Sequence, residues 1–304
     1  MTVSASAKSP GTLISALGIS DTTVSARATA IKKNDGTPIC LLALNKSVAG
    51  AVSFNGSSTF IADNCAVQSN SSHANGMEIT GTATAQAKSF CSVGGVSNAT
   101  RVSPAARSSC APVADPLASV AYPTDVSCTR TNVQVKPSEV TSLDPGVYCN
   151  GLDLKGTATL APGMYVIKDG PLNISSQAFV NGQGVTFFLT GNNAGFGING
   201  GGAVNLAAPT AGPFVGILIM QDRNANPGAS NTLSGGSETA LRGAIYTPTQ
   251  ALTVTGNNFG QPNAFMPIIV DQVKFGGSST LRANSDTQIA RPLPRVGGSA
   301  RLSE

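Results

Sequence analysis

The stretch GLDLKGTATLAPGMYVIKDGPLNISSQAF, residues 151–179, contains one short motif twice. Its unit is an apolar residue, any residue, a second apolar residue, any residue and then Gly or Ser, followed by a small residue and a further apolar one. The first copy begins at Leu152 and turns at Gly156, and the second begins at Leu172 and turns at Ser176. Because apolar and polar side chains alternate within each copy, the motif predicts a half-buried β-strand that turns sharply at the small residue.

The motif recurs along most of the chain at intervals of about 20 to 25 residues or multiples of that spacing, which is typical of stacked repeats. Further copies begin at Val52, Met77, Phe196, Leu233, Leu252 and Val273. One such strand cannot cover its apolar face alone, but copies stacked about 4.8 Å apart can cover one another. The repeat therefore predicts an all-β fold of the parallel β-helix or solenoid class, with right-handed coiling.

The composition agrees with a β-rich protein and excludes several functions. Charged residues make up 11% of the 304 residues, against about 25% in an average protein, and the net charge is only +4. The basic residues are scattered, so we expect no nucleic-acid binding. No stretch reaches the ~18 apolar residues of a membrane helix. The N-terminus lacks the pattern of a signal peptide, so either export depends on sequence upstream or the chain is not exported, and the cysteines favour export.

The six cysteines are spaced like the repeats. Successive separations are 25, 26, 19, 18 and 21 residues, and none of the cysteines lies in a C-x-x-C pair. An even number without a metal-binding pattern indicates disulfides and an oxidising compartment. Residues one repeat apart lie within the ~4.4 to 6.8 Å Cα separation that a disulfide tolerates. Of the fifteen possible connectivities we therefore predict the one between sequential neighbours, which is Cys40–Cys65, Cys91–Cys110 and Cys128–Cys149.

The pattern divides the chain into three parts. Residues 1–36 are less regular and are expected to form a cap or connector, with a short helix at 10–17 and a strand at 23–30. Residues 37–290 are expected to form the repeat domain, interrupted at about 89–137 by an irregular, proline-containing crossover that the disulfides staple. Residues 291–304 have no period and are expected to be a loose tail.

Few residues are candidates for chemistry. Asp222 and Arg223 form the most charge-dense phrase of the regular half, and two interpretations stay open: a turn cap with a local ion pair, or an interaction site. The carboxylates of that half lie on different repeats without the spacing of a glycosidase pair; they are Asp153, Asp169, Asp222, Glu238 and Asp271. The single histidine, His73, is expected in a solvated loop. The run from Asp21 to Ser25 has the Asp-x-Thr-x-Ser form of an adhesion-type metal site but lacks its context. We therefore predict no catalytic residue, no metal and no cofactor.

A set of phrases in a fixed order resembles the C-terminal region of TadG-like proteins of the tight-adherence (Flp) pilus system. The resemblance spans about residues 24 to 281. Its phrases lie at residues 39–44, 50–56, 64–67, 70–72, 114–117, 144–149, 170–172, 184–187, 208–210, 216–218, 221–223 and 243–248. Each phrase alone is weak, and the order and spacing carry the resemblance.

The resemblance implies a non-enzymatic protein of the Gram-negative cell envelope, in the periplasm or outside the cell, that serves pilus assembly, surface attachment and biofilm formation. In that family an N-terminal helix anchors the protein to the membrane, and this sequence lacks it. The implied partners are pilus or envelope proteins. Two alternatives from the repeat pattern stay open: a β-helix protein that binds or degrades polysaccharide, and a subunit that associates with itself into an extracellular filament.

Overall fold

The structure is a computed structural model that describes residues 2–9, 22–32, 36–175, 177–226, 230–236, 239–256, 265–284, 295–296 and 300–303. The chain divides into two compact units, one made of Met1–Thr37 and Arg295–Glu304 and the other of Pro38–Pro294. In the first unit, β2 (Thr22–Lys32) pairs antiparallel with both β1 (Thr2–Ser9) and β27 (Ala300–Ser303). The strand expected at residues 23–30 is confirmed, the segment expected to be a loose tail contributes β27, and the expected helix at 10–17 lies outside the described residues.

The second unit consists of parallel strands that pair with the strand one repeat away. One ladder runs through β12 (Gly146–Leu154), β14 (Gly163–Lys168), β17 (Val185–Thr190), β20 (Ile217–Gln221) and β23 (Ala244–Gly256). A second ladder runs from β12 through β15 (Leu172–Ile174), β18 (Phe196–Asn199) and β21 (Asn231–Gly235) back to β23. A separate five-stranded parallel sheet comprises β11 (Val140–Leu143), β13 (Thr157–Leu160), β16 (Phe179–Gln183), β19 (Val204–Ala207) and β22 (Thr239–Arg242).

The strand register confirms that equivalent positions of the repeats lie beside one another. Leu152 is paired with Leu172, and Leu172 with Phe196, so the apolar positions of the motif form continuous inward rows. These residues belong to a single buried core that extends through the unit. Each repeat thus covers the apolar face of its neighbour, as the alternation requires.

The pairing corrects the predicted fold class. Eight strands close into a ring, because the two ladders separate at β12 and rejoin at β23. In its hydrogen-bonded pairing this is a closed, eight-stranded parallel β-barrel, so the predicted β-helix or solenoid is wrong. The reason is that β12 and β23, with nine and 13 residues, each extend through both ladders. In β12 the chain bends between them at Asn150 and Gly151, whose φ angles are 62° and 95°.

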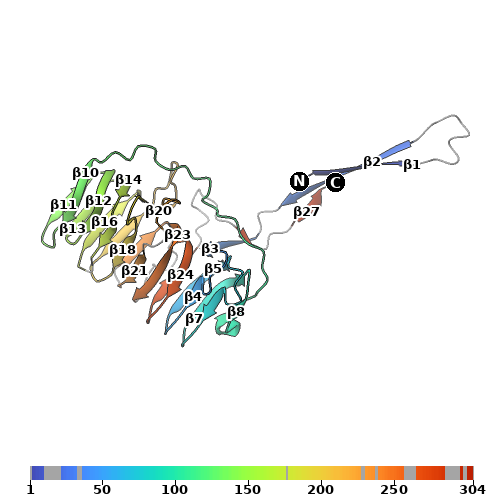
Figure 1. The fold of residues 1–304 in the computed structure, drawn as a ribbon, viewed down its shortest axis with the longest axis horizontal. Coiled ribbons are helices and arrows are strands. Elements are labelled where there is room, and N and C mark those ends of the chain that lie inside the picture. Colours follow the sequence, from blue (N-terminus) through green and yellow to red (C-terminus); the bar gives the residue numbers. More distant parts are fainter. Residues whose placement is uncertain are drawn as a thin grey trace, which may run out of the picture. The chain divides into compact units, whose positions relative to one another are not determined.

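The order of the strands in space differs from their order in the chain. Beyond β23 lies β24 (Ile268–Phe275), which pairs in parallel with β3 (Thr37–Ala43) and β4 (Val52–Phe54). Strand β25 (Thr280–Arg282) likewise pairs with β5 (Thr59–Ser69). The first repeat block therefore follows the last one in space. In Figure 1 the orange strand β24 lies beside the blue strand β4.

The two ends of this array are built differently. At one end β6 (Met77–Ile79) and β7 (Thr84–Ser92) are followed by β8 (Val96–Ser97), a 3-10 turn η2 (Ala99–Arg101) and β9 (Val102–Ser103). At the other end β10 (Arg130–Val135) pairs only with β12 among the described strands. The segment expected as a crossover, residues 89–137, thus contains three strand pairings and a connection from one end to the other.

The three predicted disulfides are confirmed. Cys40–Cys65, Cys91–Cys110 and Cys128–Cys149 have Cα separations of 5.6, 5.9 and 5.7 Å. The first joins β3 to β5 within the core. The second joins the segment that follows β9 to β7. The third joins the residues just before β10 to β12. Three disulfides place the chain in an oxidising extracellular or periplasmic environment.

One row of glycines allows a direct test of the repeat stacking. Gly56, Gly81 and Gly277 occupy equivalent corners with φ angles of 67°, 64° and 64°. A Cβ on Gly81 would lie 2.6 Å from the carbonyl oxygen of Gly56, and one on Gly56 would lie 2.7 Å from that of Gly277. A Cβ on Gly277 would meet nothing within 4 Å.

We predict that Gly56→Ala and Gly81→Ala each lower the free energy of unfolding by about 2–4 kcal/mol, because left-handed strain adds to a backbone clash. Gly277→Ala is the matched control and should cost only about 1 kcal/mol from strain. Chemical denaturation of the three variants measures the difference. Equal losses in all three would show that these corners do not stack as described.

Candidate functional site

The most elaborate set of polar contacts holds the connection between the two ends of the array. We call residues 111–127 the strap, since it is bounded by Cys110 and Cys128 and runs back over the strands toward β10 (Figure 1). Its contacts follow the spatial order of the strands. Ala111 and Val113 contact the end of β5 and the residue that follows it, Asp115 contacts β23, Tyr122 contacts β17, and Val126 accepts a hydrogen bond from β14.

The strap lies over an outward-facing row of apolar side chains. Val166, Phe188, Met220, Tyr246, Ile269 and Leu42 are in register on successive strands, and all are at most 4% exposed. These strands therefore have apolar residues on both faces, as is typical of covered parallel sheets. On the strap, Leu117 and Val120 are buried. The ring centroid of Tyr122 lies 5.1 Å from that of Phe188.

Two side-chain amides attach the first part of the strap. The Asn70 amide donates to the carbonyl oxygen of Val113 at 2.7 Å, and its oxygen accepts from the Val113 N–H at 2.9 Å. The Gln68 amide donates to the carbonyl oxygen of Ala111 at 3.2 Å. Both side chains are buried. They satisfy backbone groups of the strap that no neighbouring strand pairs.

Arg223 attaches the middle of the strap. Its backbone N–H donates to the hydroxyl of Tyr122 at 2.8 Å, and its guanidinium lies 4.6 Å from the centroid of that ring. Nε donates to the hydroxyl of Tyr246 at 2.9 Å, and the terminal nitrogen donates to the carbonyl oxygen of Leu117. One arginine thus joins two strap residues to β23.

The contact continues through Tyr246 to Asp115. The Tyr246 hydroxyl donates to Oδ2 of Asp115 at 2.6 Å, and this carboxylate lies 4.0 Å from Nε of Arg223. Burial, followed by the hydrogen bond to Asp115, raises the pKa of Tyr246 above its ordinary value. Burial likewise raises the pKa of Tyr122. Both tyrosines are therefore neutral and able to donate at physiological pH.

Asp222 has a local role. Oδ1 accepts from the backbone N–H of Asn224 at 2.9 Å, and Oδ2 accepts from the Thr190 hydroxyl at 2.8 Å. It closes a turn, which is one of the two interpretations that the sequence left open. Arg223 bonds to Leu117, 106 positions away in the chain, and to Tyr246, 23 positions away, rather than to a local partner. Both candidates are thus engaged inside the molecule.

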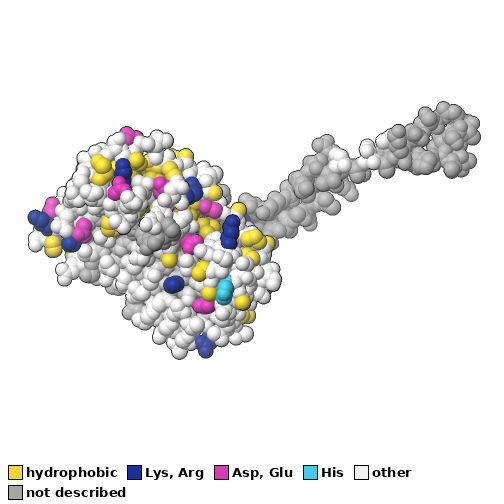
Figure 2. All heavy atoms as spheres, in the orientation of Figure 1, with side chains coloured by type: hydrophobic (Ala, Val, Ile, Leu, Met, Phe, Trp, Pro, Cys, Tyr) yellow, Lys and Arg dark blue, Asp and Glu magenta, His cyan; other side chains and the backbone are white. Residues whose placement is uncertain are grey.

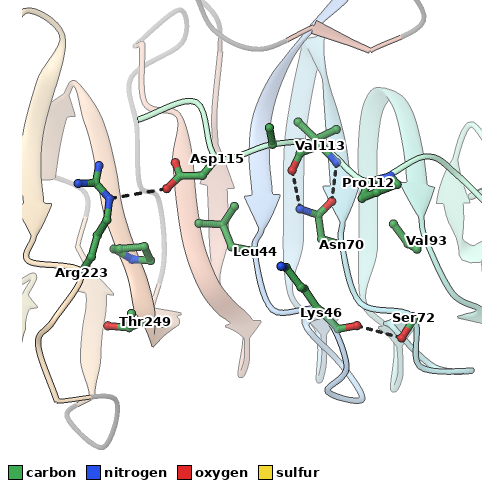
Figure 3. Close-up of a pocket in the computed structure, with 12 residues that line it drawn as sticks. Leu44, Lys46, Asn70, Ser72, Val93, Pro112, Val113, Asp115, Arg223 and Thr249 are labelled. Carbon is green, nitrogen blue, oxygen red and sulfur yellow. Dashed lines mark hydrogen bonds and ion pairs between the residues drawn. The ribbon is translucent and has the colours of Figure 1, made fainter. Parts of the chain in front are cut away.

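An open groove of about 800 Å³ lies beside this contact (Figure 3). It passes between the strap and the ends of several strands, and Arg223 and Asp115 close one end of it. The lining is mainly apolar, and it consists of Leu44, Lys46, Asn70, Ser72, Val93, Pro112, Val113, Ala114, Asp115, Arg223, Pro248 and Thr249. Lys46 is an exposed cation on the groove wall.

Each described carboxylate of the regular half bonds to its own neighbours, and no two of them share a partner. Asp153 accepts from Lys155 and Gln134, Asp169 accepts from the backbone of residue 192, and Asp271 accepts from Asn45. Glu238 lies outside the described residues. His73 is in an exposed loop, where its Nδ1 accepts the N–H of residue 75. Asp21 of the metal-like motif also lies outside the described residues.

Within the described ranges there is no group of three or more His, Cys, Asp or Glu side chains that could hold a metal ion. The same residues include no apolar helix with the length needed to cross a bilayer. The sequence did not point to Asn70, Asp115, Tyr122 or Tyr246. The continuous apolar runs at residues 187–189 and 217–220 were a signal for them, because such runs indicate strands covered on both faces.

Comparison with known proteins gives no relative: no family model matches the chain, and neither a curated protein nor a solved structure is similar to it.

We predict that Arg223→Ala lowers the free energy of unfolding by about 2–4 kcal/mol, because it leaves buried hydroxyl and carbonyl partners unpaired. It should also accelerate proteolysis within residues 113–126. Arg130→Ala is the control, since Arg130 also lies over a tyrosine ring but pairs with the exposed Asp144, and should cost less than about 1 kcal/mol. Unchanged cleavage of the strap in Arg223→Ala would contradict the proposed attachment.

Tyr246 should also make stability depend on alkaline pH. Its pKa is raised in the folded protein above 10.0, so the folded state retains a proton that the unfolded state has lost. This contribution is complete below pH 10 and is lost as the pH rises further, by up to about 1.4 kcal/mol per pH unit. We predict that Tyr246→Phe shows a shallower decline between pH 9.5 and 11 in urea denaturation. Parallel profiles for both proteins would be inconsistent with this assignment.

Proposed function

We propose that the protein is a non-enzymatic structural and adhesion protein of the Gram-negative cell envelope, acting in the periplasm or outside the cell. The observation that carries the proposal is the strap, fixed at both ends by disulfides and along its length by buried polar contacts. These contacts join repeat blocks that are separate in the chain sequence into one compact body. Such a body suits a load-bearing or surface-displayed role in an oxidising compartment.

The use of charged residues supports a structural role over a hydrolytic one. Glycosidases need two carboxyl groups at the same bond, about 5 to 9.5 Å apart. Asp153, Asp222 and Asp271 instead each bond to groups of their own neighbourhood on different strands. On the face shown in Figure 2, acidic and basic side chains lie singly or in small mixed groups. This distribution does not favour an extended polyanion as ligand.

The link to a tight-adherence pilus rests on the ordered resemblance between residues 24 and 281 and TadG-like proteins. It makes pilus or envelope proteins the proposed partners, with membrane attachment through an anchor outside this sequence.

Two features argue against the alternative of an end-to-end filament. At one end, residues 98–110 cover the last strands and are fixed by the Cys91–Cys110 disulfide. At the other end, β10 has an irregular register at Asn132, whose φ is 54°, and Pro137 follows the strand. Bulges and prolines are devices that protect an edge from further pairing.

Deletion of the gene in the encoding bacterium tests the proposed role. We expect the deletion strain to attach to surfaces several-fold less under flow, and the wild-type gene to restore attachment. A Cys128→Ser/Cys149→Ser variant should restore less, because the strap loses one fixed end, whereas His73→Ala in an exposed loop should restore fully. Undiminished attachment of the deletion strain would end the adhesive proposal.

A further inference from the structure

The outer face of the five-stranded sheet has an unusual composition. Val140 and Phe179 are the large apolar side chains that stand exposed in the described part of the chain, with 79% and 56% of their surface accessible. Val140 is in register with Thr157, and Thr157 with Phe179. The three form one outward row on β11, β13 and β16, about 10 Å long. Val140 and Phe179 thus give this row two exposed apolar side chains with Thr157 between them.

A second outward row lies next to the first and is polar. Ser142, Thr159, Asn181 and Asn205 are in register on four successive strands. All four side chains are exposed. Within the described residues, the side-chain amides of Asn181 and Asn205 have no hydrogen-bond partner. The row therefore offers donors and acceptors at intervals of about 4.8 Å beside an aromatic ring.

The face carries no charge within these two rows. Among the described residues, Glu139, whose carboxylate accepts the backbone N–H of Lys136, precedes β11, and Arg242 lies on β22. A neutral surface with one aromatic ring and flanking amides and hydroxyls is complementary to a sugar, which has an apolar C–H face and hydroxyl groups at its edge. A protein interface would instead be expected to have a larger apolar centre with Tyr, Trp or Arg anchors.

We propose that the outer face of β11, β13, β16 and β19 binds an uncharged polysaccharide. The pyranose ring stacks on Phe179, and the hydroxyls of successive sugars pair with Thr159, Asn181 and Asn205. This site rests on the adhesive function proposed above and names its ligand class. It is separate from the strap and from the groove beside it.

The experiment measures binding of the purified full-length protein to insoluble cellulose, chitin and a β-1,3-glucan, with alginate as the acidic comparison. We expect binding to at least one neutral polysaccharide and not to alginate. Phe179→Ala should weaken it by about fivefold, the loss of one stacked ring, while Phe179→Tyr stays close to wild type. Asn181→Ala/Asn205→Ala should also weaken binding. Asn173→Ala, an exposed amide on β15, is the matched control and should have no effect.

Thermal unfolding of each variant, which should be unchanged for these exposed positions, separates binding from folding. The proposal is overturned by a wild-type protein that binds no neutral polysaccharide, by alginate binding alone, or by Phe179→Ala that binds as wild type. Sedimentation velocity provides a further outcome: if Phe179→Ala dissociates an oligomer without affecting sugar binding, the face is a protein interface. A deletion strain that attaches poorly while the purified protein binds no sugar would leave the adhesive function standing and remove this site.

Discussion

Parallel register between strands one repeat apart is the constraint on which the molecule depends. Each motif supplies two or three inward apolar residues, which are too few to form a core alone. Every strand therefore needs a neighbouring strand whose apolar residues lie at the equivalent positions of the motif. The left-handed glycine corners keep this register, because at Gly56 and Gly81 the adjacent backbone occupies the place of a side chain. The continuous buried core and the long outward rows both follow from it.

The strap converts this array into a covered structure. Strands with apolar residues on both faces need a second layer, and here a single irregular segment provides it with Leu117, Val120 and Tyr122. Since an irregular segment cannot pair its backbone with a sheet, side chains of Asn70 and Arg223 bond to it instead. The strap face is thereby occupied by the protein itself, and the five-stranded sheet retains an uncovered outer face.

Local pattern was sufficient to predict the repeat, the parallel stacking and the three disulfides. Closure into an eight-stranded ring was not predictable, because it depends on whether β12 and β23 continue through a bend, and Asn150 and Gly151 resemble an ordinary turn. The order of the blocks was hidden for a different reason: all repeats share one pattern, so any two of them can stack. The residues around Arg223 are not part of the repeat pattern, and their partners lie too far apart in the chain for spacing to reveal the contacts.

The spatial order of the blocks has a consequence for how the chain acquires its structure during synthesis and export. Asn45 and Asp271, which bond across the junction of the first and last blocks, are 226 residues apart. The first block is therefore synthesised before β24, the strand that pairs with β3 and β4. Until β24 has been made, the edge of this block stays unpaired and its apolar residues stay exposed. The short-range disulfide Cys40–Cys65, which spans 25 residues, can form in that interval and hold the block together.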